Sequence, residues 1–225
     1  MGFLVNSFLG ALMHDAPNPH PRLRLAVAPG VQSSKLSALL ARQRTEEPDV
    51  TLTFCEVAGD ALREGLFEGH YDVGLSFEGH NDSTLKTQPL WTETMAIAMP
   101  SHLHLFDQAK LTIADLQDFP LYRWQAEICP LLDERLASLM PAGQESVQRV
   151  SSFEMMALCV AAGYGVGVSA RSRIQCARGW EMTVRPLADG PYEIVTYLQR
   201  SSAQANAVAE RFERRALQVT RAGAT

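Results

Sequence analysis

Residues 22–78 read RLRLAVAPGVQSSKLSALLARQRTEEPDVTLTFCEVAGDALREGLFEGHYDVGLSFE. Three parts of this stretch alternate apolar and polar side chains with the period of two that is typical of a β-strand, and they are residues 23–27, 50–54 and 71–77. The two parts between them carry leucines at helical spacing, and they are residues 35–47 and 62–69. The stretch therefore predicts strand, helix, strand, helix, strand, an order that calls for a parallel sheet with right-handed crossovers.

The boundaries of these elements have local causes. Pro29 and Gly30 end the first strand, and the helix that follows can be capped by Ser33 or Ser34. Pro48 ends this helix, because a proline removes a hydrogen-bond donor and clashes with the preceding turn.

Glycine, serine and aspartate gather at the carboxyl ends of the three predicted strands, at residues 29–34, 58–60 and 76–79. Ligands of parallel α/β sheets bind beyond this edge. The first segment leads into a helix amino terminus, where free backbone N–H groups and the helix dipole favour an anion. The alternative interpretation is that these glycines only make turns and these serines only cap helices.

The rest of the chain predicts a second α/β unit between two crossing strands. The crossing strands are residues 95–99, ended by Pro100, and residues 192–199. Between them we expect a short helix at Leu116 and a helix that Pro130 opens. We also expect a helix with a capping box of Ser151 and Glu154, and short strands at residues 121–122, 147–150 and 166–168.

Two further features complete the chain. The glycine-rich turn at residues 163–167 follows a helix and precedes a strand, so it predicts a helix end and not a dinucleotide-binding loop. A final helix, capped by Ser201 or Ser202, should place its apolar face on Val208, Ala209, Phe212, Ala216 and Val219.

Several of these segments, taken in order, resemble one protein family. RLRLAVAPG, EEPDVTLTF and GDALREGLFEGHYDVGLSF are similar to the start of the effector-binding domain of LysR-type transcriptional regulators. LWTETMAIAMPSHLHL, LTIADLQDFPLYRW and VAAGYGVGVSA are similar to later segments of that domain. The resemblance covers about residues 22–219, and its first motif positions are Pro48, Val50, Leu52, Leu66, Gly69, Asp72, Val73 and Gly74.

The resemblance implies an α/β fold of the type II periplasmic-binding-protein kind, with two α/β subdomains, two crossover strands and a hinge. Residues 22–97 and 190–219 would form subdomain I, and residues 98–189 would form subdomain II. Residues 1–21 would be an amino-terminal extension or linker, and residues 220–225 a tail.

In the resembled family, effectors bind between the subdomains. The residues of this chain at the corresponding positions are Gly30, Val31, Gln32, Ser33, Ser34, Gly59, Ser76, Phe77, Arg123, Trp124, Phe153 and Tyr164. Arg123 is the candidate partner for a carboxylate, because a guanidinium can bind a carboxylate through two parallel hydrogen bonds. The aromatic residues are candidate walls of the site, and each has core packing as its alternative.

The resemblance also implies a homodimer formed by the helix and the strand on either side of Pro48. The residues expected at that interface are Ser37, Leu40, Ala41, Arg44, Val50, Leu52 and Phe54.

Catalytic and metal-binding patterns do not emerge from the sequence. It contains no H-E-x-x-H, G-x-S-x-G or Walker motif, and the pair His102 and His104 with Asp107 is a weak metal signal. We therefore expect no enzyme activity, no metal and no cofactor.

Composition limits the partners. The net charge is −5 and the pI is near 5.7, values that argue against a broad nucleic-acid-binding face. Residues 1–20 lack a basic start, so a secretion signal is not expected, and their apolar run is too short to span a membrane. Four separated cysteines favour free, buried thiols in a reducing cytoplasm.

These observations lead to one expected function with two alternatives. The chain is expected to be the ligand-sensing domain of a LysR-type regulator, which binds a small and possibly anionic effector. DNA binding would require a winged helix-turn-helix domain, which the residues before Arg22 are too few to hold. The alternatives are a truncated regulator that modulates a full-length relative through heterodimers, and a solute-binding protein.

Overall fold

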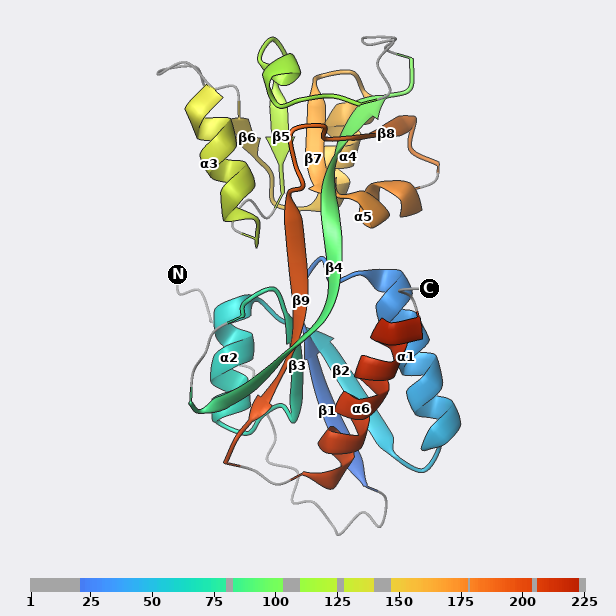
Figure 1. The fold of residues 1–225 in the computed structure, drawn as a ribbon. Helices are drawn as coiled ribbons and strands as arrows, with labels where there is room; N and C mark the ends of the chain where they lie inside the picture. Colours follow the sequence, from blue (N-terminus) through green and yellow to red (C-terminus); the bar gives the residue numbers. More distant parts are fainter. Residues whose placement is uncertain are drawn as a thin grey trace, which may run out of the picture.

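The computed structural model of the chain describes residues 21–79, 83–102, 110–124, 128–139, 147–177, 179–203 and 206–222. Its described elements form two lobes that two long strands connect (Figure 1). His104, Asp107 and residues 1–20, which were discussed above, lie outside the described residues.

The lower lobe in Figure 1 has the strand and helix order that the sequence predicts. Its elements are β1 (Arg22–Val27), α1 (Ser33–Glu46), β2 (Thr51–Glu56), α2 (Gly59–Phe67), β3 (Val73–Ser76) and α6 (Ala207–Ala222). β1 pairs in parallel with β2 on one side and with β3 on the other. α1 and α6 lie side by side, and α2 packs against β3 and β9.

The two connecting strands are β4 (Leu85–Pro100) and β9 (Glu193–Ser201). They pair antiparallel with each other from Leu85 to Thr94 of β4, and β9 also pairs with β3. From Met95 onward β4 pairs instead with β7, and from Ala96 it also pairs with β8. The sheet therefore passes from one lobe to the other at Thr94 and Met95.

The upper lobe consists of η1 (Ala114–Leu116), β5 (Leu121–Arg123), α3 (Pro130–Leu139), β6 (Val147–Arg149), α4 (Phe153–Ala161), β7 (Val166–Ala170), α5 (Arg171–Cys176) and β8 (Met182–Pro186). β5 lies between β6 and β7 and is parallel to both. Neither α5 nor β8 is predicted from the sequence, and β4 begins ten residues before the predicted strand.

Each lobe has its own hydrophobic core. Leu39 of α1, Leu62 and Leu66 of α2 and Phe212 of α6 are all fully buried in the core of the lower lobe. The upper sheet has a core on each face, one beneath α3 and one beneath α4 and α5. Burial of one such leucine stabilises the folded state by about 2 kcal/mol.

Three predicted helix caps differ from the structure. The amino-terminal cap of α1 is Gln32, whose side chain makes no capping hydrogen bond, so Ser33 already belongs to the helix. α4 is capped by Ser152, not Ser151, and its hydroxyl accepts from the Met155 amide at 3.1 Å.

The third difference concerns α6. The side-chain oxygen of Asn206 accepts hydrogen bonds from the amides of Val208 and Ala209 at 3.0 and 3.2 Å. Ser201 belongs to β9, and the hydroxyl of Ser202 donates to the carbonyl of Thr84 at 2.9 Å. These serines therefore hold the end of β9, and Asn206 caps the helix.

The predicted helix end at the glycine-rich turn is confirmed. Gly163 has a φ of 80°, and the Tyr164 amide donates back to the Cys159 carbonyl at 3.0 Å. This is the usual way for a helix to end on a glycine.

The cysteines are free, but their burial differs from the expectation. Cys129 is buried, whereas Cys55 and Cys176 are exposed. Within the described ranges, no helix is both long enough and apolar enough to cross a bilayer. The same ranges contain no cluster of three His, Cys, Asp or Glu side chains suited to a metal ion.

Candidate functional site

Two cavities are lined in part by the segment that joins β1 to α1. The first has a volume of about 280 Å³, and its walls are Gly30, Val31, Gln32, Ser33, Phe153, Glu154, Ser172, Arg173, Cys176, Ala177 and Trp180. The second has a volume of about 340 Å³, and its walls are Ala28, Pro29, Ala58, Gly59, Ser76, Phe77, Glu78, Ile128 and Pro130. Both cavities take residues from both lobes, so they form parts of one cleft.

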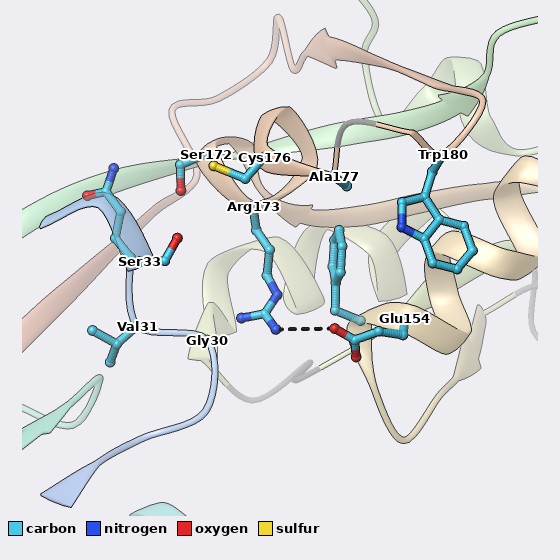
Figure 2. Close-up of a pocket in the computed structure, with 11 residues that line it drawn as sticks. Gly30, Val31, Ser33, Glu154, Ser172, Arg173, Cys176, Ala177 and Trp180 are labelled. Atoms are coloured by element: carbon cyan, nitrogen blue, oxygen red, sulfur yellow. Dashed lines mark ion pairs between the residues drawn. The ribbon is translucent and has the colours of Figure 1, made fainter. Parts of the chain in front are cut away.

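The first cavity is organised around the guanidinium of Arg173. Its carbon Cζ lies 4.3 Å from the ring centre of Trp124 and 5.0 Å from that of Phe153. Figure 2 shows Arg173 extending from α5 towards Glu154, with the Nη2 to Oε1 distance being 3.8 Å. Cation–π contacts of this kind hold a guanidinium in place while leaving its N–H groups available for a ligand.

The position of Arg173 follows from the local fold. β7 ends at Ala170, and α5 begins at the next residue, so Arg173 stands just beyond the carboxyl end of a sheet strand. The Ser172 hydroxyl donates to the Glu93 carboxylate at 2.6 Å, and this hydrogen bond fixes α5 to the crossover strand β4. Arg173 is therefore held at the junction of the two lobes.

Partial burial shifts the pKa values of the charged residues in and beside this cavity. Removal from water lowers the pKa of Arg173, and the nearby carboxylates of Glu154, Glu56 and Glu93 oppose this effect. The side chain stays a cation, because a guanidinium is too strongly basic to lose its proton in a protein. Burial also raises the pKa of Glu93, although its hydrogen bond from Ser172 and the charge of Arg173 act in the opposite direction.

The wall opposite Arg173 is the loop from β1 to α1. Gly30 has a φ of 91°, a left-handed conformation that glycine adopts without strain. α1 starts three residues later without a side-chain cap, and its first α-helical bond runs from the Leu36 amide to the Gln32 carbonyl. The earlier amides of a helix lack intrahelical acceptors, so this wall offers donors towards a cavity that already contains a guanidinium.

The second cavity is built around the end of β3. The Ser76 hydroxyl donates to the Gln199 side-chain oxygen at 3.0 Å, and the Gln199 amide group donates to the Glu78 carbonyl at 2.8 Å. Gln199 belongs to β9 and is 2% exposed. The crossover strand therefore fixes the backbone that carries Phe77 and Glu78.

Eight of the twelve predicted site residues line the cleft. Gly30, Val31, Gln32, Ser33 and Phe153 line the first cavity, and Gly59, Ser76 and Phe77 line the second. Trp124 stands behind the first cavity, where it contacts Arg173. Ser34 and Tyr164 line neither cavity, and Tyr164 is a 70%-exposed residue beyond the far end of α4.

Arg123 does not line the cleft either. It is fully buried, and its guanidinium forms an ion pair with Asp133 of α3. The cause is the alternation of side chains along β5, because Arg123 and Leu121 face α3 whereas Tyr122 faces α4. The structure thus places Arg173, and not Arg123, at the cavity.

The sequence does contain a signal for the residues that were not predicted. Ser172 and Arg173 follow the strand that ends at Ala170, and the rule that ligands bind beyond strand ends points to them. The sequence analysis considered only the carboxyl ends of the first three strands as ligand sites. It did not predict α5, the helix that carries Arg173. Glu78 also lies within a predicted strand-end segment, at residues 76–79.

Four of the seven predicted dimer residues are exposed on the lower lobe, whereas Leu40, Val50 and Leu52 are half-buried against its core. β2 is the outer strand of the described sheet and pairs only with β1. Phe54 of β2 is 65% exposed, and Ser37, Ala41 and Arg44 are exposed on α1.

The sequence matches one family model, and the fold matches solved effector-binding and regulatory domains. The family model described as the LysR substrate binding domain matches residues 16–221. The solved BenM effector-binding domain with its effector benzoate aligns with a TM-score of 0.79 and 17% identity, over 91% of this chain and 94% of that one. The QuiR effector-binding domain in complex with shikimate aligns with a TM-score of 0.76 and 15% identity, over 90% and 98% of the two chains.

A third solved structure is the reduced form of the OxyR regulatory domain from Pseudomonas aeruginosa. It aligns with a TM-score of 0.74 and 18% identity, over 90% of this chain and 98% of that one. At such identities the likeness shows a shared fold. It confirms the predicted α/β architecture of the type II periplasmic-binding-protein kind.

Proposed function

Because this chain belongs to the family of LysR substrate-binding domains, we propose that it senses a small carboxylate effector in the cleft between its lobes. The effector carboxylate binds the guanidinium of Arg173, and the loop from β1 to α1 closes on it from the other lobe. Such a ligand contacts both lobes at once, so its binding favours one angle between them over others.

The observation that carries this proposal is that Arg173 lines the cavity as a partly exposed cation with only a weak ion pair. Its side chain is 31% exposed, lines the first cavity and rests on two aromatic rings. Its ion pair with Glu154 is long, at 3.8 Å, and Glu154 is 65% exposed. A pair of this kind is worth little, so a ligand carboxylate can replace it with two short hydrogen bonds.

The ligands in the solved relatives agree with this chemistry. Benzoate and shikimate are small carboxylates, and each was found with a domain of this fold. A cavity of about 280 Å³ is at the small end of the range for ligand sites, which suits a compact molecule.

Calorimetric titration with a panel of small carboxylates that includes benzoate and shikimate tests the proposal. We expect at least one member to bind, and Arg173→Gln to weaken its binding at least tenfold, which is about 1.4 kcal/mol. Arg171→Gln is the matched control, because Arg171 belongs to the same helix but lines a different cavity beside Pro191.

Two results would contradict the proposal. One is unchanged affinity in Arg173→Gln. The other is a protein that binds no member of the panel and, by native mass spectrometry, carries no small molecule after purification.

The regulatory role has four further parts, which we propose together. The domain pairs through α1 and β2, it works in the cytoplasm, and it acts on DNA only through a winged helix-turn-helix domain. The hinge lies between subdomain I, residues 22–97 and 190–219, and subdomain II, residues 98–189. The partner change of β4 at Thr94 and Met95 supports the position of the hinge, and the exposed edge of β2 supports the pairing surface.

A further inference from the structure

The described walls of the cleft carry more negative than positive charge. Arg173 and Glu154 are the charged residues of the first cavity, and Glu78 is the charged residue of the second. Glu93 and Glu56 also act on Arg173 from nearby. A ligand with only negative charge is attracted by Arg173 but is repelled by the carboxylates on either side of it.

Glu78 and Gly59 form a matched pair at the end of the second cavity. A Cβ on residue 59 would clash with a carboxylate oxygen of Glu78, and it would lie 3.2 Å from the carboxyl carbon of that side chain. A serine or alanine at position 59 would therefore have to displace the carboxylate. The absence of a side chain at Gly59 lets Glu78 lie at the first turn of α2, which begins at residue 59.

The backbone of Glu78 is held from the side of β9 and Ser76. Gln199 donates to the Glu78 carbonyl, and the Glu78 amide donates to the Ser76 hydroxyl at 3.3 Å. The rest of the cavity wall is mostly apolar, through Ala28, Pro29, Ala58, Phe77, Ile128 and Pro130. A carboxylate carried on an anchored backbone in mostly apolar surroundings is suited to an ammonium or another strong hydrogen-bond donor.

The two cavities are neighbours along one loop. Ala28 and Pro29 line the second cavity, and the next four residues, 30–33, line the first. A single small ligand that spans this loop meets a guanidinium on one side and a carboxylate on the other.

We infer that the effector is an amino-carboxylate, whose carboxylate binds Arg173 and whose ammonium group binds Glu78. This inference rests on the proposed function and names the chemical class of its ligand. Glu78 and Gly59 then determine specificity, since they distinguish an amino-carboxylate from the plain carboxylate of the same length.

A series of matched probes tests this class. Each ω-aminoalkanoate, from glycine to 6-aminohexanoate, is compared by calorimetry with the alkanoate of the same length, because the best spacing of the two charges is left to the experiment. We expect one or more amino compounds to bind at least tenfold more tightly than their partners. Glu78→Gln should remove this preference, and Arg173→Gln should weaken both members of each pair.

Three variants make the result specific. Gly59→Ser should reduce the preference by displacing the Glu78 carboxylate, while Glu78 itself is retained. Glu154→Gln should leave the preference in place, because Glu154 lines the other cavity. Glu64→Gln is the matched control, since it removes an exposed carboxylate of α2 that lines neither cavity. Thermal unfolding shows that each variant is folded.

The outcomes separate the two proposals. If carboxylates bind through Arg173 with no gain from the amino group, the proposed function stands and this inference is overturned. A gain that survives Glu78→Gln, or that is lost only in Glu154→Gln, also overturns it. If nothing binds in a manner that depends on Arg173, both proposals fail.

Discussion

Two arginines of the upper lobe show how position decides the role of a residue. Arg123 is fully buried and paired with Asp133 inside the lobe, whereas Arg173 is partly exposed at a cavity and rests on aromatic rings. The first stabilises the fold, because a buried charge needs its partner. The second costs little stability to replace, because its ion pair is partly exposed.

We predict that Arg123→Ala lowers the free energy of unfolding by on the order of 3 kcal/mol, because it opens the core and leaves Asp133 without its buried partner. Arg173→Ala should lower it by less than about 1 kcal/mol. Equilibrium urea unfolding followed by circular dichroism measures both values. Equal losses in the two variants would show that this division of roles is wrong.

The predictions from sequence were least accurate for individual residues, namely for the helix caps and for the direction of the Arg123 side chain. The predicted caps were Ser33 or Ser34, Ser151, and Ser201 or Ser202, but the caps are Gln32, Ser152 and Asn206. Several polar residues stand near each helix start, and the backbone decides which of them has the extended conformation of a cap. Arg123 was predicted to bind the effector, but neighbouring residues of a strand face opposite sides, and the sequence did not indicate which side faces the cleft.

At the scale of elements, α1 and α6 are joined by a group of ion pairs. Arg215 of α6 is 7% exposed, and it donates to Glu46, Glu47 and Gln43 of the α1 segment at 2.7, 3.1 and 3.0 Å. Arg211 forms a further ion pair with Glu47. Burial alone would raise the pKa of Glu47, but these hydrogen bonds outweigh burial and hold the pKa below its ordinary value.

The sign of the pH dependence follows from this lowered pKa. Glu47 contributes stability above its ordinary pKa, and that contribution is lost as the pH falls through the lower pKa of the folded state. We predict that the melting temperature falls between about pH 5 and pH 3, and that it falls less steeply in Arg215→Met. Differential scanning calorimetry across this range gives the slopes. Identical slopes would mean that other carboxylates control acid unfolding.

Elements with strong periodicity were predicted well, and the others were not. The helices and strands of residues 22–78 agree in type and order with the structure, because their leucines and valines repeat regularly. α5 and β8 have six and five residues, too few to show a period, and β4 mixes polar and apolar residues before Met95. The missing α5 is the reason that Arg173 was overlooked.

At the scale of the whole molecule, the order of the segments was enough to predict two lobes with two crossing strands. This succeeded because a strand and helix order allows few topologies. The cleft required the structure, since its walls come from segments as distant in sequence as Gly30 and Trp180. The exposed surface of α1 and β2 is the remaining large-scale feature, and its role stays a prediction.

We predict that the protein is a dimer at micromolar concentration and that Phe54→Asp makes it a monomer, because the introduced charge would be buried between two copies. Phe54 is 65% exposed, so the fold should tolerate the change. Phe67→Asp is the matched control, since Phe67 is 70% exposed on α2, outside the predicted interface. Light scattering decides the matter, and a wild-type monomer at this concentration would remove the proposed interface.

The bond between Ser172 and Glu93 has a mechanical consequence. Glu93 lies one residue before Thr94 and Met95, where β4 changes its pairing partners, and Ser172 adjoins Arg173. The hinge proposed above lies at this point, so a ligand that pulls on Arg173 would act close to the axis of rotation. Rotation about that axis would displace the remote edges of the lobes, including β2, more than the residues at the centre. On this proposal, a small ligand produces a larger movement at the surface proposed to bind a second copy.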